Sequence, residues 1–223
     1  MKTTNVIVAG VGGQGSILAA HILGKAAIRK KTPDGKPLQV RIGETYGAAM
    51  RGGKVFSHVR FGDARSPLTM EDAAELIIGL EPLEALRVAI PYLSPSGVCI
   101  VNTAKYVPAD VKMGRAKYPA IPEIVGSLKK LGRKVIAFDA TAAAKGLGKP
   151  QVMSVVMLGA ASATGMLPLD EKSLMATIEA EAPKGTAELN LKAFRLGREI
   201  AEDLSRSTAA GAQGSAGSTG EVA

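Results

Sequence analysis

The fold of this chain is decided by the stretch Asn5-Val6-Ile7-Val8-Ala9-Gly10-Val11-Gly12-Gly13-Gln14-Gly15. An apolar run ends in a cluster of glycines, and a helical pattern begins at Ser16. Gly10, Gly12 and Gly15 match the pattern G-x-G-x-x-G in the strand-turn-helix context that dinucleotide binding requires. Glycines let the backbone approach a phosphate closely, and the free N–H groups at the start of a helix attract anions. The stretch predicts a phosphate-binding turn; the alternative is a turn that serves only helix-to-strand packing.

Strands and helices alternate along the first part of the chain. Apolar runs predict strands near residues 4–9, 38–42, 54–61, 76–80, 98–101 and 134–138. Helical spacing predicts helices over 14–30, from Pro82 onward, and over 122–131. Three more helices are predicted to follow, over 152–164, 170–182 and 187–204. We therefore expect an α/β fold, with a Rossmann-like three-layer sheet and a C-terminal helical cap.

Composition divides the chain into one domain, residues 1–204, and a tail, residues 205–223. The tail is rich in Ser, Gly, Ala and Thr and is predicted to be disordered, because it has too few large apolar side chains to offset its ordering entropy. Met1 leads almost directly into the first strand, and no apolar run approaches membrane-spanning length. We expect a cytoplasmic protein that inserts into no membrane.

The formal net charge of +8 does not indicate nucleic-acid binding. The basic residues are scattered, aromatic residues make up only 4% of the chain, and no recognition motif is present. An anionic ligand or an acidic partner surface explains the charge better.

Few residues have the pattern of a catalytic group. Cys99 lies in an apolar strand and is the only cysteine, so the chain can form no intrachain disulfide and ligate no iron–sulfur cluster. His21 is predicted to be an interior or boundary residue of the first helix. His58 is predicted to lie on a solvated strand face, with a partner or ligand contact as the alternative. No nucleophile elbow, metal-ligand cluster or Walker lysine is present, so we expect an incomplete catalyst with no metal site.

A second glycine-rich stretch follows the predicted strand at 38–42. Residues 43–53 are predicted to be irregular and to lie at the carboxyl edge of the sheet, where α/β proteins bind ligands. Arg51 could clamp a phosphate or carboxylate, with Gly52 and Gly53 allowing a close backbone approach. The alternative is a structural ion pair between Arg51 and Glu44.

Several ordered motifs extend over residues 5–203: Gly10-Val11-Gly12-Gly13-Gln14-Gly15, Arg51-Gly52-Gly53, Ser57-His58-Val59-Arg60-Phe61-Gly62-Asp63, Leu80-Glu81-Pro82-Leu83-Glu84-Ala85-Leu86, Val156-Met157-Leu158-Gly159-Ala160 and Leu189-Asn190-Leu191-Lys192-Ala193-Phe194. With these motifs the chain resembles the gamma-type subunits of the 2-oxoacid:ferredoxin oxidoreductases, and within that family the beta subunits of indolepyruvate ferredoxin oxidoreductases. It departs from the indolepyruvate members at Tyr46-Gly47-Ala48, where they carry a His-Gly-Met pattern. Pyruvate, branched-chain, 2-oxoglutarate and phenylglyoxylate therefore stay open as substrates beside indolepyruvate.

The resemblance implies a complex that oxidatively decarboxylates a 2-oxoacid with coenzyme A, giving acyl-CoA, carbon dioxide and reduced ferredoxin. It implies that thiamine diphosphate, Mg²⁺ and 4Fe-4S clusters belong to a partner catalytic subunit and that this chain is inactive alone. The candidate cofactor-binding residues are those that the resemblance places toward coenzyme A: Gly10, Gly12, Gly13, Gln14, Gly15, Arg51, Gly52 and Gly53. The candidate substrate or interface residues are Glu44, Tyr46 and His58.

Two other functions are consistent with the residues. A stand-alone NADP-dependent oxidoreductase would use the glycine turn for its cofactor and Arg41 for the 2′-phosphate, although Glu44 comes late for a ribose ligand. A structural scaffold would bind no ligand at all.

Overall fold

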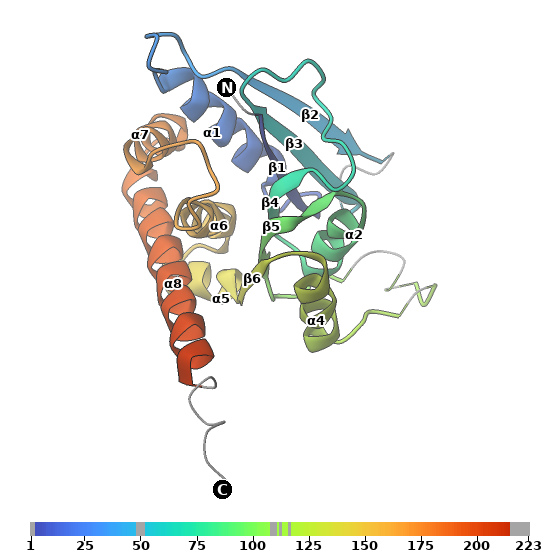
Figure 1. Cartoon of the computed structure of the whole chain (residues 1–223). Helices are drawn as coiled ribbons and strands as arrows, with labels where there is room; N and C mark the ends of the chain where they lie inside the picture. The colour runs from blue at the N-terminus through green and yellow to red at the C-terminus, as the bar shows by residue number, and fades with distance from the viewer. Residues whose placement is uncertain (1–2, 48–51, 108–110, 112, 116, 215–223) are drawn as a thin grey trace, which may run out of the picture.

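A computed structural model describes residues 3–47, 52–107, 111, 113–115 and 117–214 (Figure 1). Its centre is a six-stranded sheet with the order β2-β3-β1-β4-β5-β6. β1, β4, β5 and β6 are parallel to one another, whereas β3 runs antiparallel to both of its neighbours. The strands are β1 (Thr4–Val11), β2 (Val40–Tyr46), β3 (Lys54–Phe61), β4 (Ala74–Gly79), β5 (Leu93–Asn102) and β6 (Lys134–Phe138). The predicted α/β fold is confirmed.

Helices cover both faces of the sheet. Side chains that alternate along β1 reach two separate apolar clusters: Val6 and Val8 belong to one, and Ile7 and Ala9 to the other. Because both faces of the central strands are buried, their sequences are nearly continuous apolar runs. The second cluster contains α2 (Pro82–Tyr92) and α4 (Ile121–Leu131), and the first contains α1 (Ser16–Arg29), α5 (Ala140–Gly146), α6 (Met153–Ser162), α7 (Glu171–Glu181) and part of α8 (Ala187–Gly214).

The helical C-terminal part packs on the side of the sheet that α1 covers (Figure 1). The helices α6 and α8 approach each other backbone to backbone. A Cβ atom added at Gly197 would lie 1.8 Å from the carbonyl oxygen of Val156, and one added at Gly159 would lie 1.9 Å from that of Phe194. Only glycine fits at these two positions, so Gly159 and Gly197 fix how closely α6 and α8 pack.

Three expected boundaries are wrong. β5 begins at Leu93 and not near residue 98. β2 continues to Tyr46, so residues 43–46 are a strand and not an irregular stretch: Gly43 pairs with His58 and Glu44 with Ser57. Pairing with the regular strand β3 outweighs the low strand propensity of glycine there.

α8 also continues beyond Leu204 to Gly214, so residues 205–214 of the expected tail are helical. Extending an existing helix costs much less than nucleating one, and the Ser205 hydroxyl accepts a hydrogen bond from Lys134 Nζ at 2.9 Å. Residues 215–223 lie outside the described part of the chain.

One short helix was not expected. The helix α5 follows β6 directly and is capped by Asp139, whose Oδ1 accepts a hydrogen bond from the Ala142 N–H at 2.7 Å. A 3₁₀ turn, Pro150–Val152, then leads into α6. Together, α5 and the 3₁₀ turn bring the start of α6 back toward the edge of the sheet at which β1 and β5 end.

Candidate functional site

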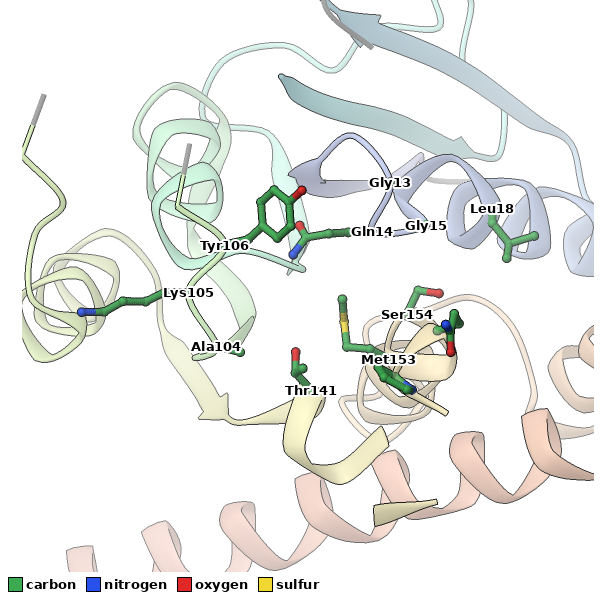
Figure 2. A pocket seen from close by; sticks show the side chains of 12 residues that line it. Gly13, Gln14, Gly15, Leu18, Ala104, Lys105, Tyr106, Thr141, Met153 and Ser154 are labelled. Carbon is green, nitrogen blue, oxygen red and sulfur yellow. The ribbon is translucent and has the colours of Figure 1, made fainter. Parts of the chain in front are cut away.

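A cavity of about 450 Å³ lies beyond the carboxyl ends of the parallel strands. Ligands of open α/β sheets bind in this position. The glycine turn after β1 forms one wall, the residues that follow β5 form a second, and the starts of α5 and α6 form the third (Figure 2). The lining residues are Gly13, Gln14, Gly15, Leu18, Ala104, Lys105, Tyr106, Thr141, Pro150, Gln151, Met153 and Ser154.

The two glycine stretches of the sequence meet at this edge. The Gly12 N–H donates to the Gly53 carbonyl oxygen at 2.9 Å, and the Gly52 N–H lies 3.4 Å from the Gly12 carbonyl oxygen. This contact places both stretches together as expected. It also means that the Gly12 N–H is already paired within the protein, which leaves the N–H groups further along the turn to face the cavity.

Within the turn, some residues hold the shape and others face the cavity. Gln14 Oε1 accepts from the Val11 N–H at 2.8 Å, and its Nε2 donates to the Leu80 carbonyl oxygen at 3.3 Å. A Cβ at Gly10 would lie 2.9 Å from Gln14 Oε1, so Gly10 makes room for this side chain. Gly13 and Gly15 have φ angles of 105° and 86°, which only glycine adopts freely, and both line the cavity.

The electrostatics of the cavity favour an anion. α1 begins beside Gly15 and α6 begins beside Val152, and neither N-terminus has a side-chain cap. Both N-termini therefore direct partial positive charge toward the same space. None of the 12 lining residues is acidic. Lys105 adds a cation at the mouth, where its ammonium points away from the glycine turn (Figure 2) and lies 5.4 Å from the Tyr118 ring centroid.

The floor of the cavity is held by Asn102, which the sequence analysis did not identify. This side chain is fully buried at the end of β5. Its Oδ1 accepts from the Ala140 N–H at 3.0 Å, and its Nδ2 donates to the Leu80 carbonyl oxygen and to Thr141 Oγ1, both at 3.0 Å. The sequence did contain a signal for Asn102, because this polar residue directly follows the apolar run at residues 98–101. Thr141 faces the glycine turn from across the cavity (Figure 2), and Ser154 packs against it, because a Cβ added at Gly15 would lie 2.9 Å from Ser154 Oγ. Both residues were missed because they are far from that turn in the sequence.

A buried carboxylate anchors the segment that carries Lys105. Glu81 has no exposed surface, and its Oε2 caps α2 by accepting from the Glu84 N–H at 2.9 Å. The Tyr118 hydroxyl donates to Glu81 Oε1. Burial raises the pKa of Glu81 and the pKa of Tyr118, which keeps the tyrosine a hydrogen-bond donor at neutral pH. The motif residue Glu81 therefore has a positioning role next to the cavity.

His58 is not solvated, contrary to expectation. The residue is 1% exposed, and its Nδ1 accepts from the Thr69 N–H at 3.2 Å. Phe56 and Tyr92 pack edge-on against its ring, with centroid distances of 5.4 and 5.3 Å. Burial, together with the positive charge of Arg60, lowers the pKa of His58. The strand face that looked polar is covered because α2 packs over it.

The remaining candidates are separate from the cavity. Glu44 Oε1 lies 2.9 Å from Nε2 of His21. This histidine, expected to be an interior or boundary residue of the first helix, is half exposed and therefore not interior. Tyr46 ends β2 opposite Val55. Arg51, and with it the expected ion pair to Glu44, lies outside the described residues.

The described residues contain no group of three or more His, Cys, Asp or Glu side chains placed to hold a metal ion. Cys99 is buried, and burial raises the pKa of its thiol to about 12. No helix among these residues is both long and apolar enough to cross a bilayer.

Comparison with solved structures defines the class of protein. The keto/oxoacid ferredoxin oxidoreductase gamma subunit from Geobacter sulfurreducens superposes with a TM-score of 0.65 at 26% identity, over 90% of this chain and 99% of that one. The model of the pyruvate ferredoxin/flavodoxin oxidoreductase family matches residues 5–200, and the chain belongs to that family.

Two curated relatives differ clearly in similarity. Indolepyruvate oxidoreductase subunit IorB of Thermococcus kodakarensis is 37% identical over 92% of this chain and 98% of its own length. The 2-oxoglutarate synthase subunit KorC of Methanothermobacter thermautotrophicus is 28% identical over 89% of this chain and 95% of its own.

Proposed function

We propose that this chain is the small subunit of an oxidoreductase that converts an aryl 2-oxoacid such as indolepyruvate, with coenzyme A, to acyl-CoA and carbon dioxide. The electron pair released by the decarboxylation passes to ferredoxin, and the thiol proton of coenzyme A is released. Full-length similarity supports the substrate class, since identity is 37% to a subunit named for indolepyruvate and 28% to one named for 2-oxoglutarate.

The cofactors of this reaction are assigned to a partner catalytic subunit. Thiamine diphosphate with Mg²⁺ and 4Fe-4S clusters would supply the decarboxylation and electron-transfer chemistry there. The present chain does not fit a cluster, because its only cysteine is buried with a pKa of about 12 and is far from acting as a thiolate. The proposal includes ferredoxin as the electron acceptor and a cytoplasmic location.

The role proposed for this chain is to bind an anionic part of coenzyme A in the cavity beyond the sheet. One observation carries the proposal: two helix N-termini without side-chain caps, at Gly15 and Val152, open on one cavity, and none of its described lining residues is acidic. The N–H groups of Gly13 and Gly15 would contact a phosphate, because those of Gly12 and Gln14 are already paired with the Gly53 and Val11 carbonyl oxygens. The Ser154 hydroxyl, which lies against Gly15, would contact it from the same side, and the Thr141 hydroxyl would face it from across the cavity. Leu18 offers apolar surface to the uncharged part of the ligand.

The other candidate residues have supporting roles in this proposal. Gly10, Gly12 and Gln14 hold the shape of the turn, and Gly52 and Gly53 brace it through the contact with Gly12. Arg51, which directly precedes Gly52 in the sequence, is proposed as a second cation for the ligand. Glu44, Tyr46 and His58 are assigned to subunit contacts or to the fold and not to coenzyme A.

A stand-alone NADP-dependent enzyme is less consistent with the geometry. β3 lies between β1 and β2, so the end of β2 is two strand spacings, roughly 10 Å, from the strand that carries the glycine turn. Arg41 is held by the carbonyl oxygen of Ala64, and Glu44 pairs with His21. Neither residue lines the cavity in which the nucleotide would have to bind.

Isolation of the native complex tests the proposed function. The chain is purified through an affinity tag, its co-purifying chains are identified, and the complex is assayed for reduction of ferredoxin with indolepyruvate and coenzyme A. We expect a larger catalytic chain with cysteine ligands for clusters, and ferredoxin reduction that requires both substrates. An active complex that uses pyruvate or 2-oxoglutarate but not an aryl 2-oxoacid would contradict the substrate class, and the absence of any catalytic partner would contradict the function.

A further inference from the structure

The strand β6 is an uncovered edge of the sheet. It pairs with β5 on one side, and on its other side no strand within the described ranges pairs with it. An open strand edge presents a row of unpaired N–H and C=O groups, which is a template for another strand. At the opposite edge, β2 is contacted by its own chain: the Arg41 side chain donates to the Ala64 carbonyl oxygen, and Gly43 lies against Pro67 and Leu68.

A groove of about 410 Å³ follows this open edge. β6 forms its floor, and the walls come from α4 on one face of the sheet and α8 on the other, as their positions in Figure 1 also indicate. Val125 and Leu204 supply apolar wall surface, and Val135 and Ala137 line the floor. An extended peptide that added to β6 would place its alternate side chains against these two walls.

The groove is strongly basic. Lys129, Arg133 and Lys134 line it, and no acidic residue among those that the structure describes does. None of these three cations takes part in an ion pair with the described residues. Lys134 Nζ donates to the Ser205 hydroxyl, and the nearest polar partner of Arg133 Nη2 is the sulfur of Met166 at 3.9 Å. Lys129 also complements the C-terminus of α4, but that role does not account for Arg133 and Lys134, which lie beyond the helix.

We propose that β6 is a docking edge for an acidic, extended segment of the catalytic partner subunit, which adds to the sheet as a seventh strand. The three cations favour an acidic partner and disfavour a second copy of this chain, since two such edges would bring six positive charges together without a counter-charge. The proposal rests on the proposed function only in naming the catalytic subunit as the source of the segment.

The test combines a charge reversal with amide exchange in the native complex. The variant Lys129→Glu/Arg133→Glu changes two exposed side chains, and Lys172→Glu/Lys184→Glu is a matched control with the same change of net charge on an exposed surface elsewhere. We expect the first variant to weaken association with the catalytic subunit by roughly tenfold or more at low salt, and by less at high salt, because the contact is electrostatic. The control should bind as the native chain does and keep the native melting temperature. The melting temperature of the first variant should fall by only the few degrees that replacing a cation at the C-terminus of α4 costs.

Hydrogen–deuterium exchange provides a readout that does not depend on substitution. Those amides of residues 134–138 that point away from β5, about every second one, should exchange at least about tenfold more slowly in the complex than in the free chain, because an added strand pairs them. Unchanged exchange at 134–138, together with unchanged binding by the reversed variant, would overturn the proposal. If the reversed variant associated with itself and kept its affinity for the partner, the proposal would also be overturned. The cations would then serve to prevent β6 from pairing with a second copy of the chain. Failure to find any catalytic partner would contradict the proposed function as well. An active complex in which neither exchange at residues 134–138 nor binding by the reversed variant changes would contradict only this inference.

Discussion

Gln14 and Asn102 donate hydrogen bonds to the same acceptor, the carbonyl oxygen of Leu80, at 3.3 and 3.0 Å. The shared acceptor ties the turn after β1 to the end of β5 through the residue that follows β4. The turn after β1 and the residues that follow β5 form two walls of the cavity, although they are far apart in the sequence. The cavity is therefore held in shape by buried polar contacts before any ligand binds.

Removal of Asn102 should destabilise the chain substantially. Asn102→Ala leaves the Ala140 N–H and the Thr141 hydroxyl without their buried partner, so we expect the free energy of unfolding to fall by about 2–4 kcal/mol. Thr141→Val removes only one of these contacts and should cost less. Urea unfolding of the purified chain measures both values. Equal stability of Asn102→Ala and the native chain would show that this network does not hold the edge.

Gln14→Ala should cost about 1–3 kcal/mol alone, because the buried Val11 N–H loses its acceptor, whereas Asn102 still satisfies the Leu80 carbonyl oxygen. In the double variant that oxygen loses both donors. The double variant should therefore lose roughly 1 kcal/mol more than the sum of the single variants. Strict additivity in the same urea measurements would argue against the shared acceptor.

The contact between α6 and α8 makes a second stability prediction. Gly197→Ala places a methyl group where the Val156 carbonyl oxygen lies 1.8 Å from the new atom, so the two helices must separate. We expect a loss of more than about 3 kcal/mol in the free energy of unfolding. Gly126→Ala in α4 is the control: its Cβ meets nothing within 4 Å, and the higher helix propensity of alanine should stabilise the chain by up to about 1 kcal/mol. Similar effects of the two substitutions would contradict the packing of the cap.

The pH dependence of stability should reflect His58. Burial lowers its pKa in the folded state from the ordinary value of 6.5, so the unfolded chain binds more protons in the range between the two pKa values. Stability contributed by neutral His58 is present above pH 6.5 and should be lost as the pH falls from that value toward the folded-state pKa. His58→Gln should flatten this part of the profile, whereas His21→Gln, a change at an exposed position, should not. An NMR titration that gives His58 a pKa above 6.5 would contradict the prediction.

The sequence predicted the elements whose pattern is set locally. Strict alternation defined β3 from Lys54 to Phe61, and proline at the first helical position marked the start of α2. The sequence pattern gave wrong predictions where tertiary contacts determine the length of a strand or the burial of a side chain. Pairing with β3 extends β2 through Gly43, and α2 buries His58 on a face that the sequence made look solvated.

The candidate site was predictable only in part. Glycines before a helix mark the turn because the backbone there needs positive φ angles, and that requirement is visible in the sequence. Asn102, Thr141 and Ser154 belong to the site because three separate segments converge beyond the sheet. Nothing in the spacing of these residues indicates that convergence, which follows from strand order and from the unexpected helix α5.

The central claim is that the cavity binds an anionic part of coenzyme A, and Leu18 offers the most direct test of it. Leu18 lines the cavity in the first turn of α1 and is 48% exposed, so Leu18→Glu should fold normally while placing a carboxylate in the anion site. In the assembled complex we expect the KM for coenzyme A to rise on the order of tenfold, and more at low salt than at high salt. Leu18→Lys should not raise it.

Ile28→Glu is the matched control, since Ile28 is an equally apolar residue of α1 that is 58% exposed and lies outside the cavity. It should leave the KM for coenzyme A unchanged. The decisive measurement is the KM for coenzyme A, at saturating 2-oxoacid, in intact complexes that carry Leu18→Glu, Leu18→Lys or Ile28→Glu. A large increase confined to Leu18→Glu is the predicted result, and an unchanged KM for coenzyme A in an intact Leu18→Glu complex would contradict the account.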